Sequence, residues 1–285
     1  MSSETGVLSV VATPIGNLRD ITLRALDVLA AVEWVAAEDT RHSRRLLDHY
    51  GLRARTVSLH EHNEAARIPR LLRLLQAGQA VALVSDAGTP LLSDPGGRLV
   101  AAAHEAGFAV VPIPGPSSLT AALSVAGLAS AERFVFEGFL PAQRTARRRR
   151  LAALASEQRA VVLFEAPHRL LDTLTDLCEL CGEQRQIVVA RELTKVHETV
   201  LRGALQTVLE SVAGDANQRR GEVVLVVAGV PAATAPETVA VEATDVLRAL
   251  LQELPLKQAV RLAARLTGQR RNTLYQQALA LAERE

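Results

Sequence analysis

The chain has 285 residues, of which 48% are hydrophobic and 22% charged, a composition typical of a globular protein with two domains and a small appendage. Its net charge of +1 excludes a general attraction to nucleic acid or to an anionic membrane, so local patches must hold any polyanionic partner. No apolar stretch could cross a bilayer and the N-terminus lacks the basic start of a signal peptide, so we expect a cytoplasmic protein without a membrane partner.

Residues 1–115 alternate between strand-like and helix-like segments. We predict strands over residues 7–14, 34–39, 56–62, 80–86 and 108–115. We predict helices over residues 23–33, 40–51, 64–78 and 96–107, the third with a kink at Pro69. Repeated strand–helix alternation with short loops predicts an N-terminal α/β domain built on a parallel, doubly wound sheet.

Residues 116–232 form a second α/β unit in this prediction. A small-residue helix comes first, and strands follow over residues 133–141, 159–167, 186–193, 198–205 and 221–229. The third and fourth of these strands are too close in sequence for a helical crossover. A mixed sheet with antiparallel neighbours is therefore expected.

Residues 233–285 are predicted to be a linker followed by a helical tail. Residues 231–243 are small and interrupted by prolines, which is typical of a linker. Two helical stretches follow, over residues 244–268, divided by Pro255, and 270–285, and they have the outline of a helix, a short glycine turn and a helix.

The loops after the first-domain strands are the expected ligand site, because open parallel sheets bind ligands beyond the carboxyl ends of their strands. These ends read ATPIGN, AEDTRH, LHEHNE, SDAGTP and PIPGPSS. The first contains Pro14, Gly16 and Asn17 and precedes a helix that Asp20 or Thr22 could cap. It has neither a dinucleotide-binding fingerprint nor a P-loop, which excludes those two classes of nucleotide site.

Two aspartates follow the apolar strand at residues 80–86. Asp94 is explained by turn chemistry, whereas Asp86 ends the strand where its carboxylate faces the predicted crevice, although a purely structural turn remains an alternative. The two do not define a metal site without further hard ligands. Cys178 and Cys181 lie near the end of a predicted helix with no second ligand pair, so we expect two half-buried thiols in a reducing compartment and no metal.

Three of these loops carry the motifs P-x-G, S-D-A-G-T-P and P-G-P-S-S, in this order along the chain. With this set of motifs the chain resembles the tetrapyrrole methylase superfamily. The first loop reads TPIGN where the superfamily usually has G-x-G-P-G-D, a departure that argues against a corrin or porphyrin substrate. The wider set is similar to one branch, the ribosomal RNA small subunit methyltransferase I family, from about residue 7 to the C-terminus. Its segments are TPIGNL, AEDTRHS, LHEHNE, VSDAGTPLLSDPG, PIPGPSS, EGFLP, HRLLDTL, RELTKVHET and GEVVLVV.

The resemblance implies two α/β domains, a homodimer, and S-adenosylmethionine as the cofactor. It implies methylation of the ribose 2′-oxygen of a decoding-centre cytidine in 16S rRNA, as free RNA or within the small ribosomal subunit. It also implies a set of cofactor-binding residues from both domains: Pro14, Gly16, Asp86, Ala87, Gly88, Thr89, Pro90, Ser117, Ser118, Phe164, Glu165, Leu193 and Glu222.

Transfer of a methyl group from a sulfonium needs no metal in principle, but a ribose hydroxyl needs help to lose its proton. The candidates for this catalytic role are Glu38, Asp39, His62 and Lys195. Glu38 and Asp39 end a predicted strand, and His60 and His62 alternate on one face of the next. Each has a structural alternative: the two acids could pair with Arg41, His60 could be a core residue, and Lys195 could lie on a solvated edge.

The candidate RNA contacts are basic. Arg147 and Arg148 belong to the run RTARRRR, and Lys257, Arg261 and Arg265 recur every four residues on one face of the tail. Arg19, Arg41 and His42 lie nearer the predicted crevice. Charge runs are more often solvated helix faces than binding sites, and that alternative stays open for both patches.

Two other function classes remain. One is methylation of a small molecule, of the tetrapyrrole or diphthine type, for which a basic helical tail would be unnecessary. The other is a non-catalytic RNA-binding protein that senses the cofactor, which turnover with ribosomal RNA would exclude.

Overall fold

The computed structural model describes residues 6–231 and 243–282. The chain forms two compact units, Met1–Pro231 and Ala232–Glu285. Within the described ranges, the first unit contains two β-sheets and the second contains three helices. The predicted linker lies mostly outside the described residues, and the predicted boundaries after residues 115 and 232 stay predictions.

The first sheet is parallel throughout, as the strand–helix alternation predicted. It consists of β1 (Val7–Val11), β2 (Trp34–Ala37), β3 (Arg55–Ser58), β4 (Val81–Val84) and β5 (Ala109–Ile113), in the order β3-β2-β4-β1-β5. All four residues of β4 are buried, because an inner parallel strand is covered on both faces. Strand β3 pairs with β2 and forms one edge of the sheet.

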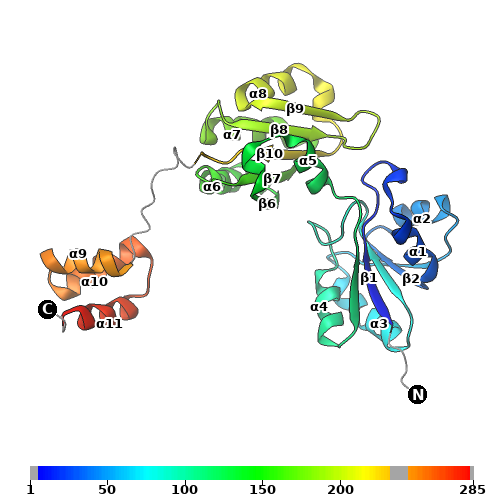
Figure 1. The fold of residues 1–285 in the computed structure, drawn as a ribbon, viewed down its shortest axis with the longest axis horizontal. Coiled ribbons are helices and arrows are strands. Elements are labelled where there is room, and N and C mark those ends of the chain that lie inside the picture. Colours follow the sequence, from blue (N-terminus) through cyan, green and yellow to red (C-terminus); the bar gives the residue numbers. More distant parts are fainter. Residues whose placement is uncertain (1–5, 232–242, 283–285) are drawn as a thin grey trace. The chain divides into compact units, whose positions relative to one another are not determined.

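Helices cover both faces of this sheet. Helices α1 (Leu23–Ala31) and α2 (Thr40–His49) pack on one face, and α3 (Glu64–Gln76) and α4 (Gly97–Glu105) on the other (Figure 1). A 3₁₀ turn, Leu18–Asp20, precedes α1, and the hydroxyl of Thr22 caps α1 by accepting from Ala25 N–H at 3.1 Å. Helix α3 continues through Pro69 as one element.

The strand predicted over residues 56–62 is wrong in its second half. Strand β3 ends at Ser58 because the side chain of Asn63 turns the chain: its Oδ1 accepts from His60 N–H at 2.9 Å, and its Nδ2 donates to Ser58 O at 3.3 Å. His60 and His62 therefore lie in a turn that leads into α3, and they do not share a strand face.

The second sheet is mixed, as predicted. Its strands are β6 (Phe134–Phe139), β7 (Ala160–Glu165), β8 (Gln186–Arg191), β9 (Thr199–Ala204) and β10 (Val223–Val227), in the order β6-β7-β10-β8-β9. Strands β6 and β7 pair in parallel, and the other neighbours pair antiparallel. Every residue of the central strand β10 is buried.

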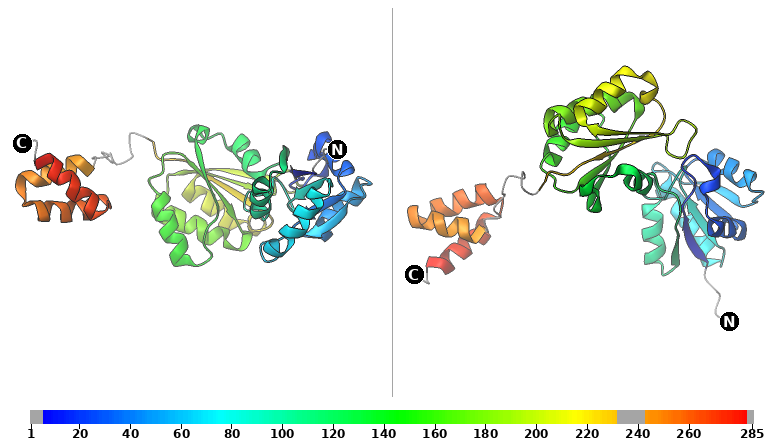
Figure 2. Two further views of the ribbon diagram at one scale, coloured as in Figure 1. Left: turned by 90° about the horizontal axis from the view of Figure 1, so that it is seen from below. Right: turned by 45° about the horizontal axis from the view of Figure 1, so that its top comes forward.

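Three α-helices cover one face of this sheet and a fourth covers the other. The core on the first face contains residues of α6 (Arg144–Leu154), α7 (Leu170–Cys181) and α8 (Leu205–Gly214) (Figure 2). Helix α5 (Ser118–Ala126) packs on the opposite face. Short 3₁₀ turns occupy Ala129–Glu132, Pro167–Arg169 and Ala216–Arg219.

The second unit consists of α9 (Ala243–Glu253), α10 (Leu256–Thr267) and α11 (Arg271–Ala282). Leu247, Val260 and Leu274, one from each helix, are buried together in its core. Gly268 ends α10 with a φ of +70°, which confirms the predicted helix, glycine turn and helix.

No helix in the described ranges has the length and apolar character needed to span a bilayer.

Candidate functional site

Hydrogen bonds join the loops at the carboxyl ends of the first sheet. Thr13 and Gly88 exchange backbone hydrogen bonds of 2.9 and 3.0 Å, which ties the loops after β1 and β4 together. The hydroxyl of Thr89 donates to Pro116 O at 3.0 Å, and the backbone N–H of Asp39 donates to Asp86 Oδ1 at 3.0 Å. The predicted convergence of these loops is therefore present.

A cavity of about 360 Å³ takes walls from both halves of the first unit, and we name it the larger cavity because it exceeds the cavity of about 140 Å³ that Pro14 borders. A third, polar cavity of about 500 Å³ adjoins it. Nine of the predicted cofactor-binding residues line the larger cavity: Ala87, Gly88, Thr89, Ser117, Ser118, Phe164, Glu165, Leu193 and Glu222. The volume is in the range of sites for small molecules and cofactors.

Four predicted cofactor-binding residues do not line this cavity: Pro14, Gly16, Asp86 and Pro90. Pro14 and Asp86 border a smaller cavity of about 140 Å³ together with His42. Local contacts accompany these positions. Beside the Thr13–Gly88 bridge, Ile15 lines the larger cavity in place of Pro14, and the Asp86 carboxylate is engaged by the backbone N–H of Asp39 in the loop after β2.

Asp94 has more than the turn role that the sequence suggested. It lines the larger cavity and also a neighbouring cavity of about 500 Å³. Burial raises the pKa of Asp94 above its ordinary 3.8, and the nearby charge of Asp86 raises it further. A hydrogen bond from Ser85 lowers this pKa and offsets part of the rise. Asp94 thus lines the larger cavity and Asp86 borders the smaller one, and the cofactor contact expected of Asp86 stays a prediction.

The neighbouring cavity is polar and holds two of the predicted catalytic residues, Glu38 and His62. It shares Ser93 and Asp94 with the larger cavity. Burial raises the pKa of Glu38 above its ordinary 4.5, and the charges of Asp86 and Asp94 raise it further. A carboxylate whose pKa is raised in this way is a better proton acceptor than an ordinary one.

Asp39 has a different environment from Glu38. It caps α2, and its carboxylate accepts from the backbone N–H of Arg41 at 2.8 Å and from Arg41 Nη2 at 2.9 Å. These hydrogen bonds lower the pKa of Asp39 to about 2. From the sequence alone, either Glu38 or Asp39 could pair with Arg41. In the structure Arg41 pairs with Asp39. Asp39, with its lowered pKa, is therefore a weaker base than Glu38.

Lys195 lies in the β8–β9 loop, where its Nζ is 2.8 Å from Glu192 Oε1 and 3.2 Å from Glu222 Oε2. Burial acts to lower the pKa of Lys195, but the hydrogen bond to Glu192 and the charge of Glu222 outweigh it and raise that pKa above its ordinary value. A lysine in this state keeps its proton at neutral pH. Lys195 is therefore a cation here, and a catalytic role for it stays a prediction.

Gly16 is close to this lysine. A Cβ at Gly16, where φ is +154°, would overlap Cγ of Lys195. A side chain at residue 16 would thus displace Lys195, which explains the glycine here by close packing of two loops.

Backbone strain is concentrated around the larger cavity. Among the described residues, the four non-glycine residues with positive φ are Leu91 (76°), Ser93 (71°), Glu192 (52°) and Thr194 (68°). Two lie beside Asp94, and two flank Leu193, which lines the cavity. Strained backbone of this kind is concentrated at functional sites.

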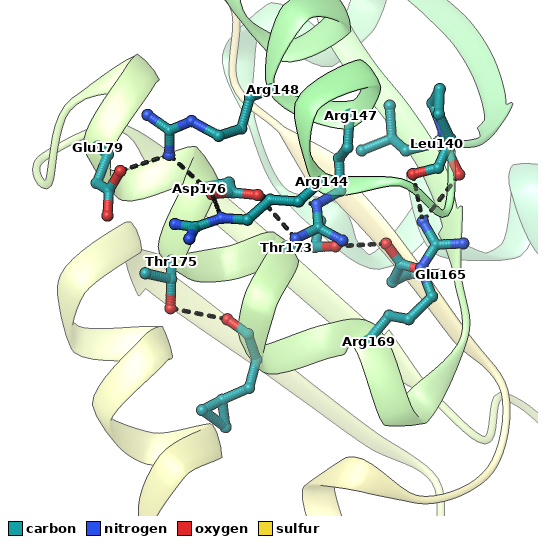
Figure 3. A network of polar contacts seen from close by, with 12 residues as sticks. Leu140, Arg144, Arg147, Arg148, Glu165, Arg169, Thr173, Thr175, Asp176 and Glu179 are labelled. Carbon is teal, nitrogen blue, oxygen red and sulfur yellow. Dashed lines mark hydrogen bonds and ion pairs between the residues drawn. The ribbon is translucent and has the colours of Figure 1, made fainter.

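Glu165 lies at the wall of the larger cavity but its carboxylate is already satisfied. Its Oε1 accepts from the backbone N–H of Ala166 at 2.8 Å, and its Oε2 accepts from the hydroxyl of Thr173 at 2.6 Å (Figure 3). Next to it, the rings of Phe136 and Phe139 contact that of Phe164 edge-on, with centroid distances of 4.9 and 5.6 Å. This side of the cavity is a rigid, partly aromatic wall.

Four of the five arginines in the run on α6 pair with carboxylates of the fold, and RNA contact by Arg147 and Arg148 stays a prediction. The carboxylate of Asp176, 1% exposed, forms ion pairs with Arg144 at 3.3 Å, Arg147 at 2.8 Å and Arg148 at 2.8 Å (Figure 3). The side chain of Arg147 is only 3% exposed, and Arg148 also pairs with Glu179. Carboxylates on α7 thus hold Arg147 and Arg148 against the fold, where phosphate has little access to them.

The other predicted RNA contacts are exposed. Arg19 and Arg41 lie on the surface of the first unit, and His42 borders the smallest of the three cavities. Lys257, Arg261 and Arg265 occupy the exposed face of α10, opposite buried Ala259, Val260 and Ala263. Within the described part of the tail they form no ion pair.

The two cysteines lie on α7, and Gly182 ends that helix by donating to Cys178 O at 3.1 Å. Burial raises the pKa of both thiols above their ordinary value. Residues 6–231 and 243–282 contain no group of three or more His, Cys, Asp or Glu side chains that could hold a metal ion.

The sequence missed several cavity residues, including Ile15, Leu92, Ser93, Asp94 and Phe139. Two signals were available. Asp94 belongs to the turn-rich segment SDPGG after β4, and Phe139 is one of only five phenylalanines in the chain.

Two family profiles match the chain. The profile of Tetrapyrrole (Corrin/Porphyrin) Methylases matches residues 7–209, and that of the RsmI C-terminal HTH domain matches residues 237–282. Among solved structures, the methyltransferase CobJ superposes with a TM-score of 0.60 at 20% identity, covering 79% of this chain and 95% of that one. Diphthine synthase gives a TM-score of 0.60 at 18% identity, covering 78% and 90%. At these identities the likeness shows a shared fold.

Curated relatives are much more similar and span the chain. Ribosomal RNA small subunit methyltransferase I of Pseudomonas aeruginosa is 54% identical, covering 96% of this chain and 97% of that protein. Its namesake in Escherichia coli O157:H7 is 51% identical, covering 96% and 95%, and that of Haemophilus influenzae is 46% identical, covering the whole of both. The chain therefore belongs to the ribosomal RNA small subunit methyltransferase I family of the tetrapyrrole methylases.

Proposed function

We propose that this protein transfers a methyl group from S-adenosylmethionine to the ribose 2′-oxygen of a decoding-centre cytidine in the 16S rRNA of the small ribosomal subunit. The observation that carries the proposal is the pair of adjoining cavities that share Ser93 and Asp94. One is lined mostly by small and apolar residues and the other mostly by polar ones, as a donor site beside an acceptor site requires.

The larger cavity suits the methyl donor. Ser117 and Ser118 begin α5, and the Ser117 side chain makes no capping bond, so the free N–H groups of that helix end can receive the donor's carboxylate. Leu92 and Leu193 supply apolar surface for the adenosine and thioether parts. Loops of the first sheet and strand ends of the second line this cavity, so a bound donor would be covered on two sides.

The acceptor ribose would occupy the polar cavity, with its hydroxyl near Glu38 and Asp94. S-adenosylmethionine would supply an activated methyl group there and would leave as the neutral thioether. Glu38 would take the hydroxyl proton as the ribose oxygen accepts the methyl group, a role that its raised pKa favours over Asp39. Lys195, as a cation paired with Glu192, holds Glu222 at the wall of the larger cavity, and His62, at the surface of the polar cavity, contacts the nucleotide.

The experiment supplies labelled S-adenosylmethionine and unmethylated small subunits, followed by mapping of the methyl group by mass spectrometry. Label on a cytidine ribose is expected. Label on a base, or on a small molecule alone, would overturn the proposal and favour the small-molecule class. Binding of cofactor and RNA without turnover would favour a cofactor-sensing protein.

Glu38→Gln tests the base. We expect the rate constant of methyl transfer to fall by about 10²- to 10⁴-fold, the usual contribution of a general base, with little change in donor affinity. In the wild type the rate should rise with pH along a limb whose midpoint lies above 4.5, and Glu38→Gln should lack that limb.

Glu61→Gln, at an 81% exposed side chain in the same cavity, is the matched control. Equal losses in both variants would remove Glu38 from the role.

We further propose that the protein acts as a homodimer, an assembly that the superfamily resemblance implies. Sedimentation equilibrium checks this, with a mass of about twice 30.5 kDa expected.

A further inference from the structure

The edge of the first sheet carries a concentration of arginine. Residues 41–73 span α2, β3 and most of α3, and they contain eight arginines and three acids, in a chain whose net charge is only +1. One of the acids, Glu64, is buried and caps α4 by accepting from Arg98 and Leu99 N–H at 3.0 and 3.2 Å. The exposed charge of this region is therefore strongly positive.

These arginines are not neutralised by the fold. Of the eight, only Arg41 forms an ion pair with a described residue, at 2.9 Å from Asp39. Arg44, Arg53, Arg55, Arg67 and Arg70 are all exposed. We name these five the β3 arginine surface.

Three members of this surface, one each from α2, β3 and α3, contact side chains of β3 or of its neighbour β2. Arg44 of α2 donates from Nη2 to Thr56 Oγ1 at 3.3 Å. Arg55 of β3 and Arg70 of α3 lie over the ring of Trp34, with guanidinium carbons 5.5 and 5.0 Å from its centroid. Stacking orders a guanidinium and leaves its N–H edge free, which is the arrangement that suits phosphate.

The β3 arginine surface leads directly to the polar cavity. Strand β3 ends at Ser58, and the turn that follows contributes His60 and His62 to that cavity. Strand β2 beside it ends at Ala37, immediately before Glu38. A strand of nucleic acid that delivered a nucleotide to this cavity could therefore run along the β3 edge.

We infer that the β3 arginine surface binds the phosphate backbone of the RNA strand that carries the acceptor nucleotide. This inference rests on the proposed function, because it takes RNA as the substrate. Charged residues also protect edge strands against pairing with other chains, which would account for Arg53 and Arg55. Edge protection does not account for Arg67 and Arg70, which belong to a helix.

The test removes charge from this surface and measures RNA binding as a function of salt. The variant Arg44→Gln/Arg55→Gln/Arg70→Gln should weaken binding to unmethylated small subunits by about tenfold or more at physiological salt, and reduce the slope of log affinity against log salt by about 2. The affinity for S-adenosylmethionine should be unchanged. A second variant, Arg44→Gln/Arg67→Gln, leaves the Trp34 stack intact and should lower the slope by about 1 to 1.5.

The matched control is Arg133→Gln/Arg219→Gln/Arg220→Gln, which removes three exposed arginines of the second sheet's half that form no ion pair with described residues. It changes net charge equally and should leave the slope within about 0.5 of the wild type. Equal slopes for the control and both β3 variants would overturn the inference, as would aggregation of the β3 variants without loss of RNA affinity. If the wild type neither binds nor methylates the subunit, the proposed function fails instead.

Discussion

Two arginine clusters of this protein differ in what surrounds them. The run on α6 has the higher density in sequence, yet Asp176, Glu179 and Glu137 pair with four of its five members. The arginines around β3 are spread over residues 41–73, and there Arg41 alone has a carboxylate partner among the described residues. Whether an arginine is free to bind phosphate thus depends on carboxylates from other parts of the chain that lie next to it in the fold. The number of arginines in a short stretch of sequence is a poor guide to this.

Asp176→Asn is the strongest test of this contrast. It leaves three guanidiniums, one of them buried, without their shared anion, so we expect the free energy of unfolding to fall by about 3–5 kcal/mol in urea denaturation. Glu179→Gln, at a side chain 49% exposed, should cost about 0–1 kcal/mol. Similar losses in the two variants would mean that the buried carboxylate does not organise the α6 cluster.

The same carboxylate should make the fold sensitive to acid. Burial acts to raise the pKa of Asp176, but the hydrogen bonds from Arg148 and Arg147 prevail and hold it below 3.8. Because the folded pKa is lower than the unfolded one, its stabilisation is complete above about pH 5 and is lost as pH falls through the folded pKa. The difference in unfolding free energy between wild type and Asp176→Asn should therefore shrink below about pH 4. A difference that grew with acid would contradict the assignment.

The tail offers a third basic region with which to sharpen the comparison. Lys257→Gln/Arg261→Gln/Arg265→Gln removes an exposed row that has no ion pair among residues 243–282. If the row contacts RNA, binding should weaken by several-fold and the salt slope should drop by about 2. An unchanged slope in filter binding would make it a solvated helix face.

Arg41→Gln should have the smallest effect. Loss of its hydrogen bonds should let the pKa of Asp39 rise from about 2 toward its ordinary 3.8, which NMR titration of the carboxyl carbon would detect. The pair is exposed, so the thermal midpoint at neutral pH should barely change. An unmoved Asp39 pKa would show that another group holds it low.

Much of the fold was predictable from local patterns. Buried strands such as β4 and β10 read as unbroken apolar runs, and Thr22, Gly182 and Gly268 marked helix ends by their chemistry. Strand β3 was overextended because His60 and His62 continue a strand-like alternation, and only the Asn63 side chain ends the pairing. The hydrogen bonds of the Asn63 side chain replace the backbone hydrogen bonds with which β3 would continue, and the alternation of polar and apolar residues carries no sign of this.

The sequence by itself determined the two α/β halves, the helical tail, the loops that converge and the family resemblance, because these follow from periodicity and from short motifs. Only the tertiary structure decided which side chains of those loops face a cavity. Asp94, in place of Asp86, forms the shared wall, and Lys195 is held as a cation by Glu192 and Glu222. Burial and charge partners come from residues distant in the chain, so the availability of a carboxylate or a guanidinium is a property of the folded protein.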